Sequence, residues 1–170
     1  WTFRKQKKFF TICQWTGNGS NRTISHDLGS VPGAIFVKNL SDGSEYWRVY
    51  HRSMKASPQD YEMYLNVTNV PASASSTWNQ TAPTSSVFSL GTENGVNKNG
   101  DNFVAYLFAH NNSDGTFGES GDKDIIKCGS YTGNGQTTGQ EINLGFEPQW
   151  MLIKDTTSEK NWQLIDVMRG

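Results

Sequence analysis

The sequence predicts an all-β fold, an antiparallel β-sandwich or jelly-roll-like module with long loops and little helix. Short runs that are apolar or alternate in polarity recur along the chain, and segments rich in Gly, Asn, Ser and Asp separate them. Aromatic residues form 12% of the chain and favour strands. No window shows the apolar spacing of three and four residues that an amphipathic helix needs. Many short strands with little helix are typical of sandwiches and jelly rolls.

Ten strands are expected, each a short run bounded by turn residues. In order they are Phe9–Trp15, Arg22–His26, Ala34–Asn39, Tyr46–His51, Tyr61–Asn66, Ser86–Gly91, Asn102–His110, Asp124–Tyr131, Gln149–Lys154 and Trp162–Val167. One helical turn is expected within Ser53–Tyr61, because Ser57-Pro58-Gln59-Asp60 resembles a helix start. The small, polar segment Asn69–Ser86 predicts a long surface loop that crosses between sheets.

An internal repeat organises the chain. Gln14–Lys38 aligns with Ser130–Lys154 at an offset of 116, and Trp47-Arg48-Val49-Tyr50 aligns with Trp162-Gln163-Leu164-Ile165 after one deletion. Such a long period is typical of modular arrays. The positions common to both copies are interpreted as scaffold: Gly17 and Gly19 with Gly133 and Gly135 in turns, Pro32 with Pro148 before a strand, and Trp47 with Trp162 in the core.

The repeat predicts the domain organisation. Residues 1–126 are expected to form one β module, entered late in a preceding repeat because Trp1-Thr2-Phe3 resembles Tyr106-Leu107-Phe108. Residues 127–170 are expected to begin a second copy that packs into the same β unit. We favour a segment of a larger multi-module polypeptide over the alternative of a small protein with a duplicated half.

Charge and cysteine content limit the classes of partner. The formal net charge is −1, so no strong field favours nucleic acid. The basic run Arg4–Lys8 is interpreted as a solvated hairpin loop rather than a DNA contact. No run is long enough to span a bilayer. Cys13 and Cys128 occupy different columns of the repeat and are expected to be free thiols, which agrees with assembly in a reducing cytoplasm.

The sequence offers few signals for chemistry, and we expect no enzyme, no cofactor and no bound metal. The three His residues have no metal-ligand spacing, and there is no Gly-x-Ser-x-Gly elbow. The loop Ser113–Asp124 carries four acids, Asp114, Glu119, Asp122 and Asp124. They could ligate Ca²⁺, and Glu119, Asp122 and Asp124 could act as paired carboxylates on a glycan. We favour a plain solvated loop, since the first copy replaces it with Arg4–Lys8.

Several long strings resemble a known family. They are TGNG…RTISHDLGSVPGAIFVK, WRVYHRSM, TWNQTAPTSSVFSLG, FVAYLFAH, IIKCGSYTGNG and LGFEPQWMLIK. Together they resemble, over nearly the whole chain, a repeated module of tail-fibre and other structural proteins of marine tailed phages, cyanophages especially. The resemblance implies a β-rich virion-appendage protein assembled in the host cytoplasm. It also implies partners among other virion proteins and copies of itself, with trimers usual for phage fibres. It transfers no catalytic residue.

Four functional hypotheses follow. The first is a non-enzymatic tail-fibre module that contributes to attachment to the host surface, through weak sites for bacterial surface glycan that act together. A sugar site needs an aromatic platform beside polar groups, and the candidates are Trp78 with Asn79, then Tyr61 and Tyr64. Trp78 is either the anchor of its loop or an exposed contact. The alternatives are a structural spacer, connector or capsid decoration without ligand, a glycan-depolymerising tailspike-type domain, and a cellular lectin-like domain.

Overall fold

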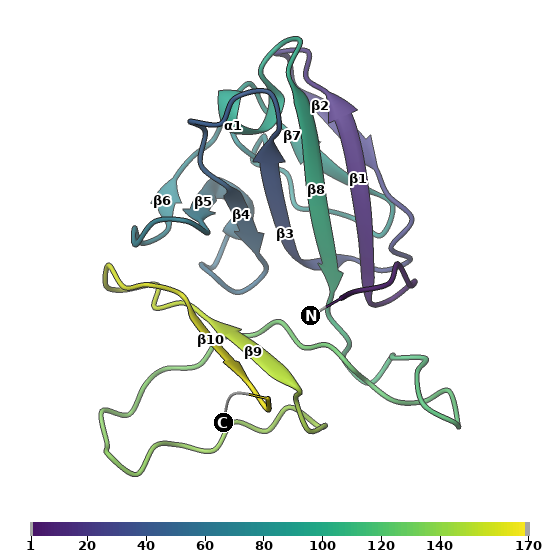
Figure 1. Ribbon diagram of the computed structural model, residues 1–170, viewed down its shortest axis with the longest axis vertical. Helices are drawn as coiled ribbons and strands as arrows, with labels where there is room; N and C mark the ends of the chain where they lie inside the picture. Colours follow the sequence, from purple (N-terminus) through teal and green to yellow (C-terminus); the bar gives the residue numbers. More distant parts are fainter. Residues whose placement is uncertain (1, 169–170) are drawn as a thin grey trace.

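The computed structural model describes residues 2–168 and consists mainly of β-strands (Figure 1). The strands are β1 (Phe10–Thr16), β2 (Arg22–Ser25), β3 (Pro32–Asn39), β4 (Arg48–His51), β5 (Tyr61–Tyr64), β6 (Ala72–Ser73), β7 (Val87–Leu90), β8 (Asn102–Ala109), β9 (Trp150–Ile153) and β10 (Gln163–Asp166). Two short helical turns, η1 (Pro58–Asp60) and α1 (Asn94–Asn97), interrupt them. The turn η1 confirms the one expected before Tyr61.

The main sheet has six antiparallel strands in the order β1-β8-β3-β4-β5-β6 (Figure 1). Strand β8 lies second from one edge of this sheet, where it pairs with the edge strand β1 from Phe10↔Phe108 to Thr16↔Asn102 and with β3 on its other side. Both neighbours of β8 precede it by sixty residues or more, so the sheet depends on long-range pairing. An apolar strand such as Asn-Phe-Val-Ala-Tyr-Leu-Phe-Ala suits a position that is covered on both edges.

A second, two-stranded sheet of β2 and β7 supplies the other layer. Its residues Ile24, Phe88 and Leu90 are buried in one cluster with residues of the large sheet. At the centre, the ring of Trp15 meets Phe88 edge-on at 5.7 Å and stacks on Phe103 at 5.5 Å. The prediction of an all-β, antiparallel, sandwich-like fold is therefore confirmed.

The two tryptophans of the repeat do not share the position expected of them. Trp162 is half-buried, packs against the core and donates from Nε1 to the Tyr64 carbonyl at 2.8 Å. Trp47 is also half-buried, but it lies outside the buried cluster and stacks on Tyr106 at 6.0 Å. The expectation of a core position was wrong for Trp47, which precedes β4 and packs on the Tyr106 ring of β8 instead of entering the buried cluster.

The C-terminal third departs most from the expected strands. Asp124–Tyr131 is not a strand, and no strand occurs from residue 127 to residue 149. The chain makes a wide excursion there before it returns as the β9–β10 hairpin (Figure 1). This hairpin forms its own two-stranded sheet. It contacts the first module through Trp162, through Lys154 Nζ on the Thr68 carbonyl at 2.9 Å, and through the rings of Phe3 and Trp150 at 5.7 Å.

The segment Asn69–Ser86 is a crossing loop, but it is better anchored than its composition suggests. It contains the short edge strand β6, and Thr77 and Trp78 lie buried within it. Between residues 2 and 168, no helix has both the length and the apolar character required to cross a bilayer.

Candidate functional site

A shallow polar pocket of about 450 Å³ opens between η1, the start of β5 and the crossing loop. Eight residues line it: Lys55, Ala56, Ser57, Asp60, Tyr61, Ser73, Ser75 and Gln80. They include one aromatic ring, one amide, three hydroxyl groups besides the phenol, one carboxylate and one ammonium group. Such a mixture of ring, amide and hydroxyl groups suits a neutral, hydroxyl-rich ligand better than a highly charged one.

The floor of the pocket is set by the turn η1. Pro58 fixes the backbone angle at the start of this turn, and the Tyr61 N–H closes it by donating to the Pro58 carbonyl. The Ala74 N–H then donates to the Asp60 carbonyl at 2.9 Å, which ties the crossing loop to the turn. Tyr61 is half-buried and packs against the core, so its ring is held in place at the pocket wall.

The rim of the pocket depends on a sharp bend after Trp78. Asn79 and Gln80 both have positive φ, at 50° and 48°, a backbone region that non-glycine residues seldom adopt. The Thr81 N–H donates to the Trp78 carbonyl at 3.1 Å and closes the bend. Because two adjacent residues turn in the left-handed sense, Gln80 is exposed at the pocket rim while Trp78 stays in the core.

The structure separates the four sequence-predicted ligand residues. Tyr61 lines the pocket, and Lys55 Nζ lies 5.9 Å from the centre of its ring. Trp78 is 2% exposed and meets Tyr50 edge-on at 5.9 Å, so it is the anchor of its loop and offers no surface platform. Asn79 is half-buried at the bend and does not line the pocket. Tyr64 belongs to a neighbouring network of charges.

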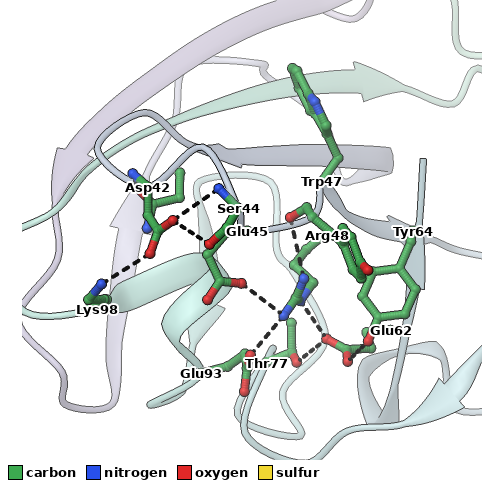
Figure 2. A network of polar contacts seen from close by, with 12 residues as sticks. Asp42, Ser44, Glu45, Trp47, Arg48, Glu62, Tyr64, Thr77, Glu93 and Lys98 are labelled. Carbon is green, nitrogen blue, oxygen red and sulfur yellow. Dashed lines mark hydrogen bonds and ion pairs between the residues drawn. The ribbon is translucent and has the colours of Figure 1, made fainter. Parts of the chain in front are cut away.

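That network centres on Arg48, which is buried among three carboxylates (Figure 2). Its Nη2 lies 2.8 Å from Glu93 Oε1 and 3.4 Å from Glu45 Oε2, and its Nε lies 3.0 Å from Glu62 Oε2. The Nε–Glu62 contact is an ion pair without the direction of a good hydrogen bond. Burial alone would lower the pKa of Arg48, but the hydrogen bond to Glu93 and the charge of Glu62 raise it overall.

Glu62 links this network to the crossing loop. It accepts hydrogen bonds from Thr77 Oγ1 at 2.8 Å and from the Tyr64 hydroxyl at 2.6 Å. Arg48 lies over the Tyr64 ring, 4.9 Å from its centre (Figure 2). Burial, together with Glu62, raises the pKa of Tyr64 to about 12. The network therefore holds Thr77 in place, three residues before Gln80 at the pocket rim. The Tyr64 hydroxyl is used in a hydrogen bond within the network.

The four acids of the Ser113–Asp124 loop, which were the alternative Ca²⁺ ligands, make separate local contacts. Asp124 accepts the backbone N–H groups of Ser113 and Gly115 at 2.8 and 2.9 Å and pairs with Lys127. Asp114 accepts the Asn112 N–H, Asp122 pairs with Lys123, and Glu119 is exposed. Within residues 2–168, no three His, Cys, Asp or Glu side chains converge on a point that could hold a metal ion. Asp114 and Asp124 instead hold backbone N–H groups of their own loop.

The two thiols are free in the described part of the chain, as the repeat alignment predicted. Cys13 is half-buried, and burial raises its pKa to about 11. The Cys128 sulfur packs closely against Gly33, since a Cβ atom added to that glycine would lie only 2.7 Å from the sulfur. Burial raises the pKa of Cys128 to about 12. Neither thiol has the lowered pKa of a reactive cysteine.

Of the residues that line the pocket, only Tyr61 was predicted from the sequence as a ligand residue. Lys55, Asp60 and Gln80 carry no motif, and the helical turn around Pro58 was the one signal that the chain bends beside Tyr61. Comparison with known proteins adds family membership alone. No curated protein and no solved structure matches the chain. Residues 4–170 match a family described as "Domain of unknown function (DUF7483)", and the chain belongs to that family.

Proposed function

We propose that this protein is a non-enzymatic module of a virion appendage such as a phage tail fibre, and that it contributes to attachment to the host surface. The observation that carries the proposal is the pocket beside Tyr61. An aromatic ring, the Gln80 amide and several hydroxyl groups are the groups that bind sugars, and a rigid β scaffold presents them. The sequence resemblance to phage fibre modules gives the biological setting.

The ligand we propose is a bacterial surface glycan, bound weakly and by many copies at once. A shallow pocket buries little ligand surface, so one site alone would be weak, and avidity along an oligomeric fibre would supply the affinity. Asp60 is the one carboxylate among the residues lining the pocket. Glycoside hydrolysis ordinarily uses a pair of carboxylates, so binding is favoured over depolymerisation.

The experiment is whole-cell binding by the labelled protein, presented as an oligomer, across candidate marine bacterial hosts. Two pocket variants, Tyr61→Ala and Gln80→Ala, are compared with Tyr131→Ala, which removes an exposed ring outside the pocket. Saturable, strain-selective binding that surface polysaccharide competes, and that both pocket variants but not Tyr131→Ala weaken at least tenfold, is the expected result. Equal binding by all variants would refute the pocket assignment.

A structural spacer or connector is the second candidate. The observation that favours it is the repeat itself, because the β9–β10 hairpin reproduces the β3–β4 hairpin, as an array of identical spacers would require. Absence of binding to every strain that the parent particle infects would favour this reading over attachment.

A further inference from the structure

The second copy of the repeat reproduces part of the first residue for residue. In the first copy Ala34 pairs with His51 and Val37 pairs with Arg48. In the second copy Trp150 pairs with Asp166 and Ile153 with Gln163. These are equivalent positions, since the first strand is displaced by 116 residues and the second by 115. The two hairpins therefore have identical register, and β9–β10 is structurally a second β3–β4.

The turns that depend only on local sequence are also reproduced. The Asn18 side chain accepts the Ser20 N–H at 3.0 Å, and the Asn134 side chain accepts the Gln136 N–H at 3.0 Å. Gly19 and its equivalent Gly135 both have φ of 67°. A side chain and a glycine one residue apart suffice for this turn, so it forms whether or not a sheet surrounds it.

The parts that depend on distant partners are missing from the second copy. Strand β3 is paired on both edges, with β4 and with β8, whereas β9 is paired with β10 alone within the described residues. The segment equivalent to β1, residues 126–132, is not a strand. In the first copy the strand that joins these two elements is β8, which lies between β1 and β3. Within residues 2–168 there is no second strand in that position.

Exposure shows that the rest of the sandwich is missing around the second hairpin. In the first copy Val49 is fully buried and Tyr50 is 4% exposed, but their equivalents Leu164 and Ile165 are 48% and 44% exposed. All four residues of β9 are half-buried, where β3 has Ile35 and Val37 at 1% and 0%. The second hairpin thus keeps apolar residues in a position that only a completed sandwich would bury.

We propose that the free edge of β9 is the docking site for an antiparallel strand of the β8 type, supplied by a further copy of the repeat in the same polypeptide. Its signature is that of Asn102–Ala109, with apolar side chains on both faces. Docking would use the unpaired backbone groups of β9 on one side and order residues 126–132 as a strand on the other. Strand addition to an open sheet edge needs no other recognition chemistry.

The first copy displays this occupant on the equivalent hairpin. The β3–β4 hairpin has the same register and is covered by β8 on the equivalent edge. A second, separate chain would have to bring a β8 strand that already pairs on both of its edges, with β1 and with β3. It would lose one of these pairings in order to donate the strand. A further repeat that is joined to the chain carries no such competing pairing.

The test compares amide hydrogen exchange in the chain and in a version extended after Gly170 by a duplicate of residues 56–126, which completes the second copy. We expect exchange at residues 126–132 and at Trp150–Ile153 to slow at least tenfold on extension. The matched control is the same extension with Ala105→Pro and Leu107→Pro in the duplicate alone, because proline removes the ladder donors. Exchange in the control should equal that of the unextended chain.

A second measurement keeps the result interpretable if the extended chain folds poorly. A peptide of residues 100–111 with flanking lysines, added to the unextended chain, should slow the same amides, and a scrambled peptide should not. No slowing in either experiment would overturn the proposal. It would also be overturned if the unextended chain already protects β9 in a concentration-dependent manner, because the occupant would then be a second molecule.

Discussion

Removing Arg48 is the most informative perturbation of this fold. The Arg48 side chain is 7% exposed and pairs with three carboxylates, of which Glu62 is the most buried at 11% exposure. The Glu93 and Glu45 side chains are more exposed, at 31% and 22%, so water can solvate them when the arginine is removed. Breaking a buried pair from one side typically costs 3–5 kcal/mol. Because only one of the three acids is deeply buried, we expect Arg48→Met to cost about 3 kcal/mol.

Adding Glu62→Gln to Arg48→Met tests the cause. If the cost arises from an uncompensated charge at Glu62, the double variant should recover about 1–2 kcal/mol, since the amide keeps its shape and can still bond Thr77. The assay is urea unfolding at pH 7 followed by tryptophan fluorescence. Lys98→Met is the control, because this lysine is 42% exposed and its pair with Asp42 should hardly affect the midpoint.

Two results would refute this account of Arg48. One is a loss below about 1 kcal/mol in Arg48→Met, which would mean that water solvates Glu62 freely. The other is a further loss when Glu62→Gln is added, which would mean that Glu62 stabilises the fold through its hydroxyl partners rather than through Arg48.

Three further predictions concern burial. Trp78→Ala should cost about 3–5 kcal/mol in thermal or urea unfolding, because the ring is 2% exposed; a cost below about 1 kcal/mol would contradict its role as anchor. Burial, with the charge of Arg52, lowers the pKa of His51 to about 4. As pH drops from about 6.5 to 4, His51 is protonated in the unfolded chain but stays neutral in the folded protein. The free energy of unfolding should therefore fall over this range. His51→Gln should reduce that slope but not abolish it, because burial also lowers the pKa of His26 and of His110; an unchanged slope would contradict the assignment to His51. Cys13 and Cys128 should alkylate at pH 8 at least about 100-fold more slowly in the folded than in the unfolded protein; fast native labelling would contradict their burial.

Most strands could be predicted from the sequence because their side-chain patterns are local. The run Asp124–Tyr131 fails for a physical reason, since it resembles β1 and β1 is a strand only because β8 pairs with it. A pattern indicates that a segment can be a strand, but a partner decides whether it becomes one. Strand β6 was missed for the opposite reason, because Ala72 and Ser73 have little strand propensity and follow β5 as an edge.

The candidate site was less predictable, because it depends on where loops meet. Tyr61 could be selected as an aromatic residue beside a helical turn, but Gln80 reaches the same pocket through two adjacent residues with positive φ, which no motif marks. From the sequence, Trp78 was interpreted as an anchor of its loop in preference to an exposed contact, and its 2% exposure shows that it is the anchor. One sequence signal pointed to the buried Arg48. It is a charged residue two positions before the apolar Tyr50, and alternation along a strand places both side chains on the same face.

The position of β8 between β1 and β3 has a consequence for synthesis on the ribosome. Phe10 of β1 pairs with Phe108, which is synthesised 98 residues later, so this edge of β1 stays unpaired until then. At translation rates of roughly 5–20 residues per second, that interval lasts about 5–20 s. During it the β3–β4 hairpin and the local turns can form, but the backbone N–H and C=O groups of β1 and β3 that pair with β8 stay unpaired. In a tandem array every module would pass through this vulnerable interval in turn, and chaperone demand would rise and fall once per repeat.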